Sequence, residues 1–243
     1  MKNTQDWHKD FFTNFYYELF MKRSAQKIAE EVNIIDELIG NKNILNIMDV
    51  CCGVGDISAE ISKRRNIEAW GIEYSNDYVE CNQLKNIIQG DARIKQTNQK
   101  FSLVLNWFSS FSYFNKEENY QILNNCYEYC NDLFVLETAN SACTLKNFIP
   151  LMSYTKELNG ETYQVERISN INLLDNTLEQ DWIINNNNFK KIHNTKSYLY
   201  FPKDIKDTLL KIGFSKVDMF GLKDGKISEL TIDSPRLLIK AQK

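Results

Sequence analysis

The sequence contains no long apolar run. Its 243 residues include no stretch that approaches the roughly 18 consecutive apolar residues of a membrane-spanning helix. Residues 1–30 also lack the apolar segment of a secretory signal peptide. We therefore expect neither membrane spanning nor secretion, and we predict a cytoplasmic protein.

An excess of positive charge is also absent. The net charge is −3, and only six of the 29 basic residues are arginines, which are spread along the chain. A protein that binds nucleic acid usually presents a basic face. We therefore expect no nucleic-acid partner.

The cysteines form no metal-binding pattern. None belongs to a CxxC pair, and only His8 and His193 could complete a zinc site. Cys126 and Cys130 are expected to face the core from one helix. We predict no metal, and we predict free buried thiols, which fit a reducing compartment. The six cysteines are Cys51, Cys52, Cys81, Cys126, Cys130 and Cys143.

One stretch, residues 44–56, organises the rest of the pattern. The apolar run Ile44–Val50 predicts a buried strand, Gly53 and Gly55 follow it, and helical spacing begins at Ile57. A buried strand, a glycine turn and a helix N-terminus together form a site for a nucleotide-like ligand. We interpret both glycines as positions where a Cβ would hold the ligand away from the backbone.

Short apolar runs alternate with amphipathic helices between residues 44 and 140. This order predicts an α/β fold with a Rossmann-like, doubly wound, mostly parallel sheet, whose ligands bind at the carboxyl ends of the strands. The predicted strands are Ile44–Val50, Ala69–Tyr74, Ile87–Gln89, Ser102–Trp107 and Leu133–Glu137. An acid or an amide stands at the end of each: Asp49, Glu73, Asp91, Asn106 and Glu137.

Further regions complete a predicted single domain of residues 1–243 around the cofactor-binding core of residues 41–145. Residues 1–40 carry aromatic and apolar stripes that predict helices, which pack on the main sheet or form a lid with Tyr16 or Tyr17 over the ligand. Residues 151–200 show strand-like alternation, which predicts an antiparallel β insert over the site or at a dimer face. Residues 201–243 predict a helix and a terminal antiparallel hairpin. The runs within the last two regions are Glu161–Ser169, Ile171–Leu174, Leu178–Ile184, Asn188–Ile192, Pro202–Ile212, Ser215–Phe220 and Arg236–Ala241.

Two classes of nucleotide-binding protein fit the glycine turn. Residues 53–58 nearly supply the G-x-G-x-x-G motif of an NAD-dependent oxidoreductase, and Glu73 stands where such an enzyme has its ribose-binding acid. Asp49 and Asp91 favour a different ligand. An acid before the turn would repel a pyrophosphate, but it suits S-adenosylmethionine (SAM), which carries an amine and a sulfonium.

The motifs resemble those of the class I SAM-dependent methyltransferases over nearly the whole chain. Residues 49–55 (DVCCGVG) resemble the family's first motif, with Cys51 where glycine is usual. The resemblance implies that Glu73 binds the ribose hydroxyls and that Asp91, in the GDAR sequence of residues 90–93, receives the adenine amino group. It implies SAM as cofactor, S-adenosyl-L-homocysteine (SAH) as product, and cofactor binding by Tyr16, Asp49, Cys51, Gly53, Gly55, Glu73, Tyr74, Asp91, Ala92 and Asn106.

A second motif resembles one found in the small-molecule branch of this family, whose members act on sugars and secondary metabolites. Residues 105–114 (LNWFSSFSYF) resemble its "N-hydrophobic-F-[TS]-S-F-G-Y-F" segment, with Ser112 in place of glycine, and residues 234–239 resemble its closing hairpin. The resemblance implies that the acceptor pocket is built from residues after the fourth and fifth strands and from the insert. The candidates are Trp107, Phe111, Glu137, Asn140, Tyr198 and Tyr200.

Methyl transfer is an in-line displacement with a neutral leaving group, so the enzyme mainly aligns the acceptor and excludes water. A general base is needed only when the acceptor is protonated at working pH. The candidates are His8, Tyr113, His193 and Glu137. We retain His8, in the lid, and Tyr113, after the fourth strand, as candidate catalytic residues.

We predict a SAM-dependent methyltransferase that modifies an oxygen or nitrogen of a small polar acceptor, such as a sugar or a nucleotide-linked intermediate, as a monomer or homodimer. Methylation of RNA or protein is an alternative that would require an open trough beside Asn106. An NAD-dependent oxidoreductase and a non-catalytic partner subunit are further alternatives. The sequence leaves the acceptor and the choice between oxygen and nitrogen open, because pocket residues lie on variable loops.

Overall fold

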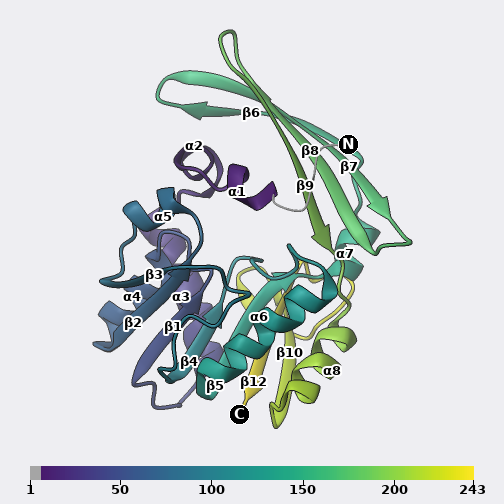
Figure 1. Ribbon diagram of the computed structural model, residues 1–243. Helices are drawn as coiled ribbons and strands as arrows, with labels where there is room; N and C mark the ends of the chain where they lie inside the picture. The colour runs from purple at the N-terminus through teal and green to yellow at the C-terminus, as the bar shows by residue number, and fades with distance from the viewer. Residues whose placement is uncertain (1–6) are drawn as a thin grey trace.

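The chain forms two β-sheets with a layer of short helices between them (Figure 1). The computed structural model describes residues 7–243, so the first six residues of the predicted lid lie outside the described residues. The larger sheet has eight strands and the smaller has four. No helix in the described part of the chain is long and apolar enough to cross a membrane.

The eight-stranded sheet confirms the predicted fold class. Its order is β11-β10-β12-β5-β4-β1-β2-β3, and the five strands β1 to β5 all run parallel to one another. All five predicted core strands are present. The strands of this sheet are β1 (Asn46–Val50), β2 (Glu68–Glu73), β3 (Asn86–Gln89), β4 (Phe101–Asn106), β5 (Cys130–Ala139), β10 (Lys216–Lys223), β11 (Lys226–Ser228) and β12 (Arg236–Gln242).

The C-terminal strands form the predicted antiparallel pair, but not a simple hairpin. β12 returns between β10 and β5 and is antiparallel to both, while the short strand β11 pairs with the other edge of β10. The sequence analysis missed β11 because three residues are too few for a strand periodicity to show.

Helices cover both faces of this sheet because alternate strand residues point to opposite faces. Met48 lies in the core under α6 and α8, whereas its neighbour Ile47 lies in the core under α3 and α4. Local capping defines the helix starts: Ser24 caps α3, and Asn115 forms a capping box with Glu118 at α6. The helices are α3 (Ala25–Ile39), α4 (Asp56–Arg65), α5 (Asn76–Glu80), α6 (Lys116–Tyr129), α7 (Ser141–Lys146) and α8 (Pro202–Ile212).

The predicted β insert is a four-stranded antiparallel meander of order β6-β7-β8-β9. Two boundaries differ from the expectation. Residues 151–158, not predicted as a strand, form β6, and the runs Glu161–Ser169 and Ile171–Leu174 are not separate strands. Both runs belong to the single strand β7, which continues to Asn172 because the exposed Asn170 fits the alternation of buried and exposed residues. Leu174 lies in the turn that follows. The strands are β6 (Leu151–Leu158), β7 (Glu161–Asn172), β8 (Thr177–Asn185) and β9 (Lys190–Tyr198).

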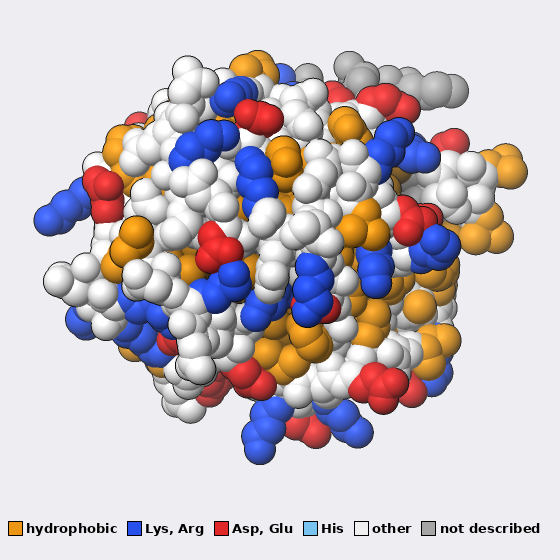
Figure 2. All heavy atoms as spheres, turned by 90° about the horizontal axis from the view of Figure 1, so that it is seen from below, with side chains coloured by type: hydrophobic (Ala, Val, Ile, Leu, Met, Phe, Trp, Pro, Cys, Tyr) orange, Lys and Arg blue, Asp and Glu red, His pale blue; other side chains and the backbone are white. Residues whose placement is uncertain are grey.

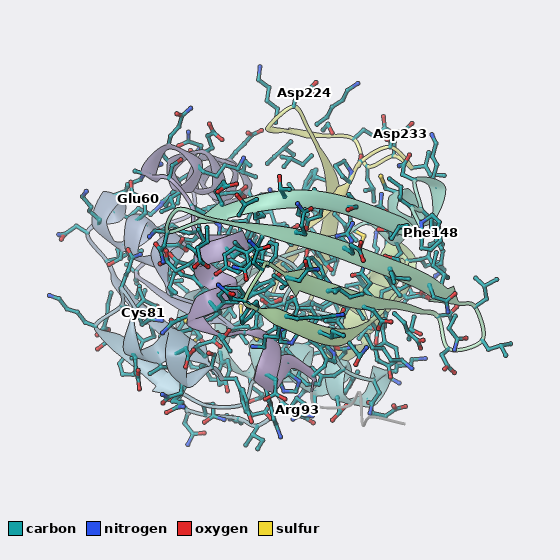
Figure 3. The ribbon with its side chains drawn as sticks, turned by 90° about the horizontal axis from the view of Figure 1, so that it is seen from above. Glu60, Cys81, Arg93, Phe148, Asp224 and Asp233 are labelled. Carbon is teal, nitrogen blue, oxygen red and sulfur yellow. The ribbon has the colours of Figure 1, made fainter. Side chains whose placement is uncertain are left out.

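The N-terminal segment, residues 7–23, lies beneath the insert, whose strands cross over it in the view from above (Figure 3). Its aromatic stripe divides between two neighbours: Phe12 contacts Tyr78 of α5 and Tyr113 after β4, but other residues pack on the insert. Phe15 packs against Tyr163 and Phe189, and Phe20 packs against Trp182, all in the insert or its β8–β9 turn. The segment comprises α1 (Trp7–Phe11), α2 (Asn14–Tyr16) and the π-helical turn η2 (Tyr17–Met21).

The cysteines are all free, but not all are buried. Cys126 and Cys130 are buried as predicted, although Cys130 is the first residue of β5 rather than part of the helix. Cys81 is exposed, contrary to the expectation, because it follows a short helix at the edge of the sheet. Cys51 and Cys52 are half-buried in the glycine turn.

Candidate active site

A cavity lies between the carboxyl ends of strands β1 to β4 and the N-terminal segment, as expected for a doubly wound sheet. The space inside it is about 1070 Å³, open solvent at the mouth included. Predicted site residues that line it are His8, Asp49, Cys51, Gly53, Glu73, Tyr74, Asp91, Ala92, Trp107 and Tyr113. No residue of the insert is among its lining residues in the described part of the chain.

The glycine turn after β1 has a left-handed backbone at three positions. Cys51, Gly53 and Gly55 have φ angles of 62°, 59° and 72°. A glycine at the position of Cys51 would avoid the strain of this conformation, which explains why glycine is usual there. The two glycines differ in their roles. A Cβ on Gly53 would meet nothing within 4 Å, whereas a Cβ on Gly55 would lie 2.6 Å from Asn82 Oδ1.

Gly55 therefore does not have the predicted role of letting a ligand approach the backbone. It does not line the cavity, and a side chain there would collide with Asn82 and Leu84 rather than with a ligand. Its backbone starts α4 as the N-cap residue. Gly53, in contrast, lines the cavity and fits the predicted close approach of a ligand.

Asp49 is a buried carboxylate, only 3% exposed, at the end of β1. Ser58 Oγ donates a hydrogen bond to its Oδ2 at 2.5 Å. Burial raises the pKa of Asp49 to about 7, and the negative charges of Asp56 and Glu73 raise it further. The hydrogen bond from Ser58 acts in the opposite direction. The cavity thus offers a carboxylate that a bound cation would stabilise.

Glu73 is fixed by the backbone of two loops. Its Oε2 accepts a hydrogen bond from Gly53 N at 2.9 Å, and its Oε1 accepts one from Ser75 N at 2.7 Å. Burial raises its pKa, and these backbone donors partly offset that effect. The lone pairs that these donors leave can accept hydrogen bonds from a ligand.

Asp91 is neutralised within the protein. Arg93 donates hydrogen bonds to Asp91 from its backbone and from its guanidinium, and Arg93 Nη1 also pairs with Glu118 at 2.5 Å. Burial alone would raise the pKa of Asp91, but the hydrogen bonds and charge of Arg93 outweigh it and lower the pKa. Asp91 therefore has less acceptor capacity for a ligand than Glu73 has.

Arg23 is a cavity residue that the sequence analysis missed. It lies between η2 and α3, its Nη1 pairs with Asp56 Oδ2 at 2.9 Å, and its guanidinium stacks 3.7 Å from the centre of the Phe108 ring. Tyr17, which was predicted as one of two possible lid residues, also lines the cavity, together with Met21 and Asp56, which were not predicted. No motif surrounds Arg23 or Met21, so only the tertiary packing of the N-terminal segment reveals them, whereas Asp56 directly follows the glycine turn.

The loop after β4, residues 107–114, forms one wall of the cavity. Phe108, Ser109 and Ser112 have φ angles of 65°, 56° and 91°, which are unusual for residues other than glycine. The left-handed Ser112 stands where the related segment has glycine. Tyr113 lines the cavity, whereas Phe111 faces a second cavity between α6 and α8.

A buried ion-pair cluster holds this loop. Arg236 Nε pairs with Glu137 Oε1 at 2.9 Å, and its Nη1 and Nη2 pair with Glu31 at 2.9 Å each. Glu137 also accepts a hydrogen bond from Ser109 N at 3.0 Å, and Glu31 accepts one from Trp107 Nε1 at 3.0 Å. Glu137, predicted to contact an acceptor, is instead occupied by the protein, because β12 brings Arg236 beside it.

Residues 47–132, from β1 to the start of β5, match the family model of a methyltransferase domain. The chain carries a methyltransferase domain. The match agrees with the predicted methyltransferase, and the solved structures below confirm its predicted fold. No curated protein matches the sequence.

Solved methyltransferases have a similar fold at low identity. A SAM-dependent methyltransferase from Clostridium acetobutylicum ATCC 824 is 14% identical with a TM-score of 0.73, covering 94% of this chain and 96% of that chain. DesVI from Streptomyces venezuelae is 18% identical with a TM-score of 0.72, covering 96% and 97%. The sugar N-methyltransferase KedS8 from Streptoalloteichus sp. ATCC 53650 is 15% identical with a TM-score of 0.70, covering 95% and 92%.

Several predicted site residues do not line the cavity of this methyltransferase. Tyr16 is buried against Phe11, and the neighbouring Tyr17 lines the cavity in its place. Asn106 is buried and donates from Nδ2 to Val50 O at 2.7 Å. Asn140 caps α7 and donates to backbone oxygens near β12. Phe111, Tyr198 and Tyr200 line the second cavity, which the base of the insert forms with α6 and α8.

The candidate bases occupy different places in the methyltransferase. His8 lines the cavity, with its ring 5.4 Å from that of Tyr74 and 4.9 Å from that of Phe114. Burial raises the pKa of Tyr113 far above its usual range, so this phenol is protonated at neutral pH. His193 lies in the insert against Phe11, and burial lowers its pKa to about 4.

Proposed function

We propose that this methyltransferase transfers the methyl group of SAM to an amine nitrogen of a small polar acceptor, such as an amino sugar or a nucleotide-linked sugar. The proposal rests on the surplus of buried negative charge in the cavity. Asp49, Asp56 and Glu73 are all less than 9% exposed, and Arg23 is the one cation paired with any of these three among the described residues.

The cavity residues fit a ligand that carries an amine and a sulfonium. In this assignment Asp49 binds the amine, which relieves the cost of its burial, and Glu73 accepts the two ribose hydroxyls through its remaining lone pairs. Tyr74 and Asp91 lie at the adenine end. When bound, SAM supplies an electrophilic methyl group with a neutral leaving group.

The protein residues near Asp49 favour nitrogen over oxygen. An alcohol needs a general base, whereas an amine needs only to be in its neutral form. Tyr113 is protonated at neutral pH and can orient an acceptor by accepting or donating a hydrogen bond, but it is not a base. His8 lies beside Tyr74 and Phe114, at the end assigned to the adenosine. The end assigned to the methyl group is therefore built to align an acceptor rather than to deprotonate it.

Proteins of similar fold support this choice. They include the sugar N-methyltransferase KedS8, an amino pentose methyltransferase from Micromonospora echinaspora and the glycopeptide N-methyltransferase MtfA. The insert above the N-terminal segment also favours a small acceptor over RNA or a protein side chain (Figure 3). Basic and acidic side chains are interspersed on the face turned away from the insert (Figure 2), which does not favour a polyanion there.

Calorimetry with SAM and SAH tests the cofactor assignment. The wild-type protein is expected to bind both, and Asp49→Ala and Glu73→Ala are each expected to weaken binding about 10-fold or more, since each loses a buried charged contact. Glu60→Ala is the matched control, because Glu60 pairs with Arg64 on the outside of α4, away from the cavity. Full affinity of both cavity variants would contradict the assignment.

A second assay tests the choice of nitrogen. The protein is incubated with SAM and paired acceptors, amino sugars and the corresponding sugars with a hydroxyl at the same position, and SAH and methylated product are quantified by mass spectrometry. We expect turnover of amines, with a rate that rises with pH until the amine is neutral. Turnover of the hydroxyl sugars alone would refute the proposal.

A further inference from the structure

A third cavity, which we call the hydroxyl pocket, lies beside the carboxyl end of β5. The space inside it is about 340 Å³, open solvent at the mouth included, which is within the range of pockets that bind small molecules. No charged side chain lines it in the described part of the chain. Instead, the loop after β4, β5, α7 and β9 contribute five hydroxyl side chains: Ser112, Thr138, Ser141, Thr144 and Ser197.

Most of these hydroxyls have no hydrogen-bond partner in the protein. Thr144 Oγ1 donates to Asn140 O at 3.2 Å, and the other four hydroxyls make no hydrogen bond to any described residue. Thr138 and Ser141 are only 4% and 3% exposed, yet their oxygen atoms are not sealed by the protein and reach the pocket. An unsatisfied buried hydroxyl costs about 1–3 kcal/mol. The pocket therefore requires hydrogen-bonding molecules inside it, either water or a ligand.

Ser112 adds its hydroxyl to the pocket despite an unfavourable backbone. Its φ angle of 91° lies in the left-handed region, which glycine adopts without strain. The segment that residues 105–114 resemble has glycine at this position, so the serine retains strain that a glycine would remove. Tyr198 N donates to Ser112 O at 2.8 Å and helps to hold this conformation. A strained residue beside a cavity indicates a function for its side chain.

Two tyrosines connect the hydroxyl pocket to the second cavity, because Tyr198 and Tyr200 line both. Tyr200 Oη accepts a hydrogen bond from Asn119 Nδ2 at 2.9 Å, so its own hydrogen has no acceptor among the described residues. The Tyr200 ring lies 5.1 Å from that of Phe111. Aromatic rings beside several hydroxyls match a sugar ring, which has an apolar face and polar edges. The uncharged lining favours a ring without a phosphate or an ammonium group.

The hydroxyl pocket and the active-site cavity share the loop of residues 107–114 as a wall. Tyr113 lines the active-site cavity, whereas its neighbour Ser112 lines the hydroxyl pocket. The two sites also lie at the carboxyl ends of neighbouring parallel strands, β4 and β5. A ligand in the hydroxyl pocket therefore contacts the same loop that forms the wall for the methyl acceptor.

We propose that the hydroxyl pocket is a second ligand site, which binds an uncharged sugar ring through Ser112, Thr138, Ser141 and Ser197. The ring belongs either to a remote unit of the methyl acceptor or to a separate sugar, and the same hydroxyl contacts recognise it in both cases. The site itself does not rest on the proposed function, whereas the assignment of the ring to the acceptor does.

NMR titration of the isotope-labelled, SAH-bound protein tests the site. The probes are methyl α-glucoside, methyl α-mannoside and methyl α-galactoside, which are uncharged and differ in the orientation of single hydroxyls. We expect at least one probe to shift the amide signals of residues 138–144 and 197–200 in a saturable way.

Matched variants identify the groups that bind. The double variant Thr138→Val with Ser141→Ala removes two hydroxyls and should weaken sugar binding about 10-fold or more, since two hydrogen bonds are lost. Ser153→Ala with Thr155→Val removes the same groups from exposed positions of β6 and should leave binding unchanged. Ser112→Gly should weaken binding without a loss of thermal stability, because the strain that it relieves offsets the entropy of glycine.

Two results would overturn the sugar site: no saturable shift with any of the three probes, or equal binding to the Thr138→Val, Ser141→Ala double variant. Either result would mean that the pocket holds only water. If the double variant does not fold, Ser112→Gly replaces it, and sugar affinity equal to that of the wild type would then overturn the site.

Kinetics separates the two sources of the ring. With the amine that the acceptor assay identifies, the double variant should raise KM at least about 10-fold at unchanged kcat if the ring is part of the acceptor. An unchanged KM would assign the pocket to a separate sugar, and both results support the site. Failure of every amine to turn over would refute the proposed function, and the NMR titration would still decide the role of the hydroxyl pocket.

Discussion

At the scale of single residues, the three acids of the cavity are not equivalent. Asp91 is neutralised by Arg93, and Glu73 is held by two backbone donors. Asp49 has only the hydroxyl of Ser58 as a hydrogen-bond donor among the described residues. Asp49 is therefore the acid whose protonation state should depend most on a bound cation, and its contribution can be measured through pH.

Asp49 should give both stability and cofactor affinity a pH dependence. Its pKa rises from 3.8 to about 7 on folding. Between these values the folded state holds a proton that the unfolded state has lost, so stability falls as pH rises through this window. A cationic ligand favours the ionised form, so SAM affinity should rise as pH increases toward 8, and SAM binding near pH 7 should release a proton from Asp49.

The variant Asp49→Asn tests both effects. At pH 8 it should be more stable than the wild type by about 1–3 kcal/mol, since it removes a buried charge, while its SAM affinity should fall. Thermal unfolding from pH 4 to pH 8 and calorimetry in buffers of different ionisation enthalpy measure the two quantities. A variant that keeps the wild-type pH profile would show that another group titrates.

At the scale of elements, the loop after β4 depends on strands and helices far from it in sequence. Phe108 and Ser109 adopt left-handed conformations, and the cluster of Arg236, Glu31 and Glu137 holds them. A strained loop persists only where its surroundings determine it. The cluster should therefore position the acceptor wall without touching a ligand.

Glu137→Gln should separate the loop from the cofactor site. The glutamine amide has a single acceptor oxygen and no charge, so it cannot accept the hydrogen bonds from both Ser109 and Arg236. We therefore expect a loss of about 1–3 kcal/mol in unfolding free energy. Methyl transfer should fall at least 10-fold in kcat/KM, while SAM affinity stays within about twofold, because no cofactor contact changes. Glu128→Gln, at a half-buried residue of α6 that pairs with Lys95, is the control. Weakened SAM binding, with unchanged turnover at saturating SAM, would argue against a positioning role.

At the scale of the whole molecule, the N-terminal segment is held between two sheets. Phe20 packs on Trp182 of the insert, while Tyr17 and Met21 line the cavity on the other side of the segment, which lies between the two sheets in Figure 1. The insert therefore contributes to the active site indirectly, by holding the segment that covers it.

Trp182→Ala should loosen this cover. Trp182 packs against Phe11, Tyr16 and Phe20, and its removal should cost about 2–4 kcal/mol for a half-buried aromatic side chain. Hydrogen exchange in residues 7–21 should become at least 10-fold faster, and SAM affinity should fall. Ile192→Ala, on the outer face of the same sheet, should change neither. Unchanged exchange in Trp182→Ala would mean that the main sheet alone holds the segment.

The parts of this methyltransferase that depend on neighbours along the chain could be predicted from local patterns alone. The β1 strand, the glycine turn and the α4 helix are local, so strand periodicity and the two turn glycines predicted both the fold class and the positions of Asp49 and Glu73. Which other side chains reach the cavity depends on contacts between elements that are far apart in the chain. Arg236 pairs with Glu31 across 205 positions of the chain, and this pairing occupies Glu137. Local patterns carry no information about such contacts, because burial and charge pairing depend on which distant strands and helices come together.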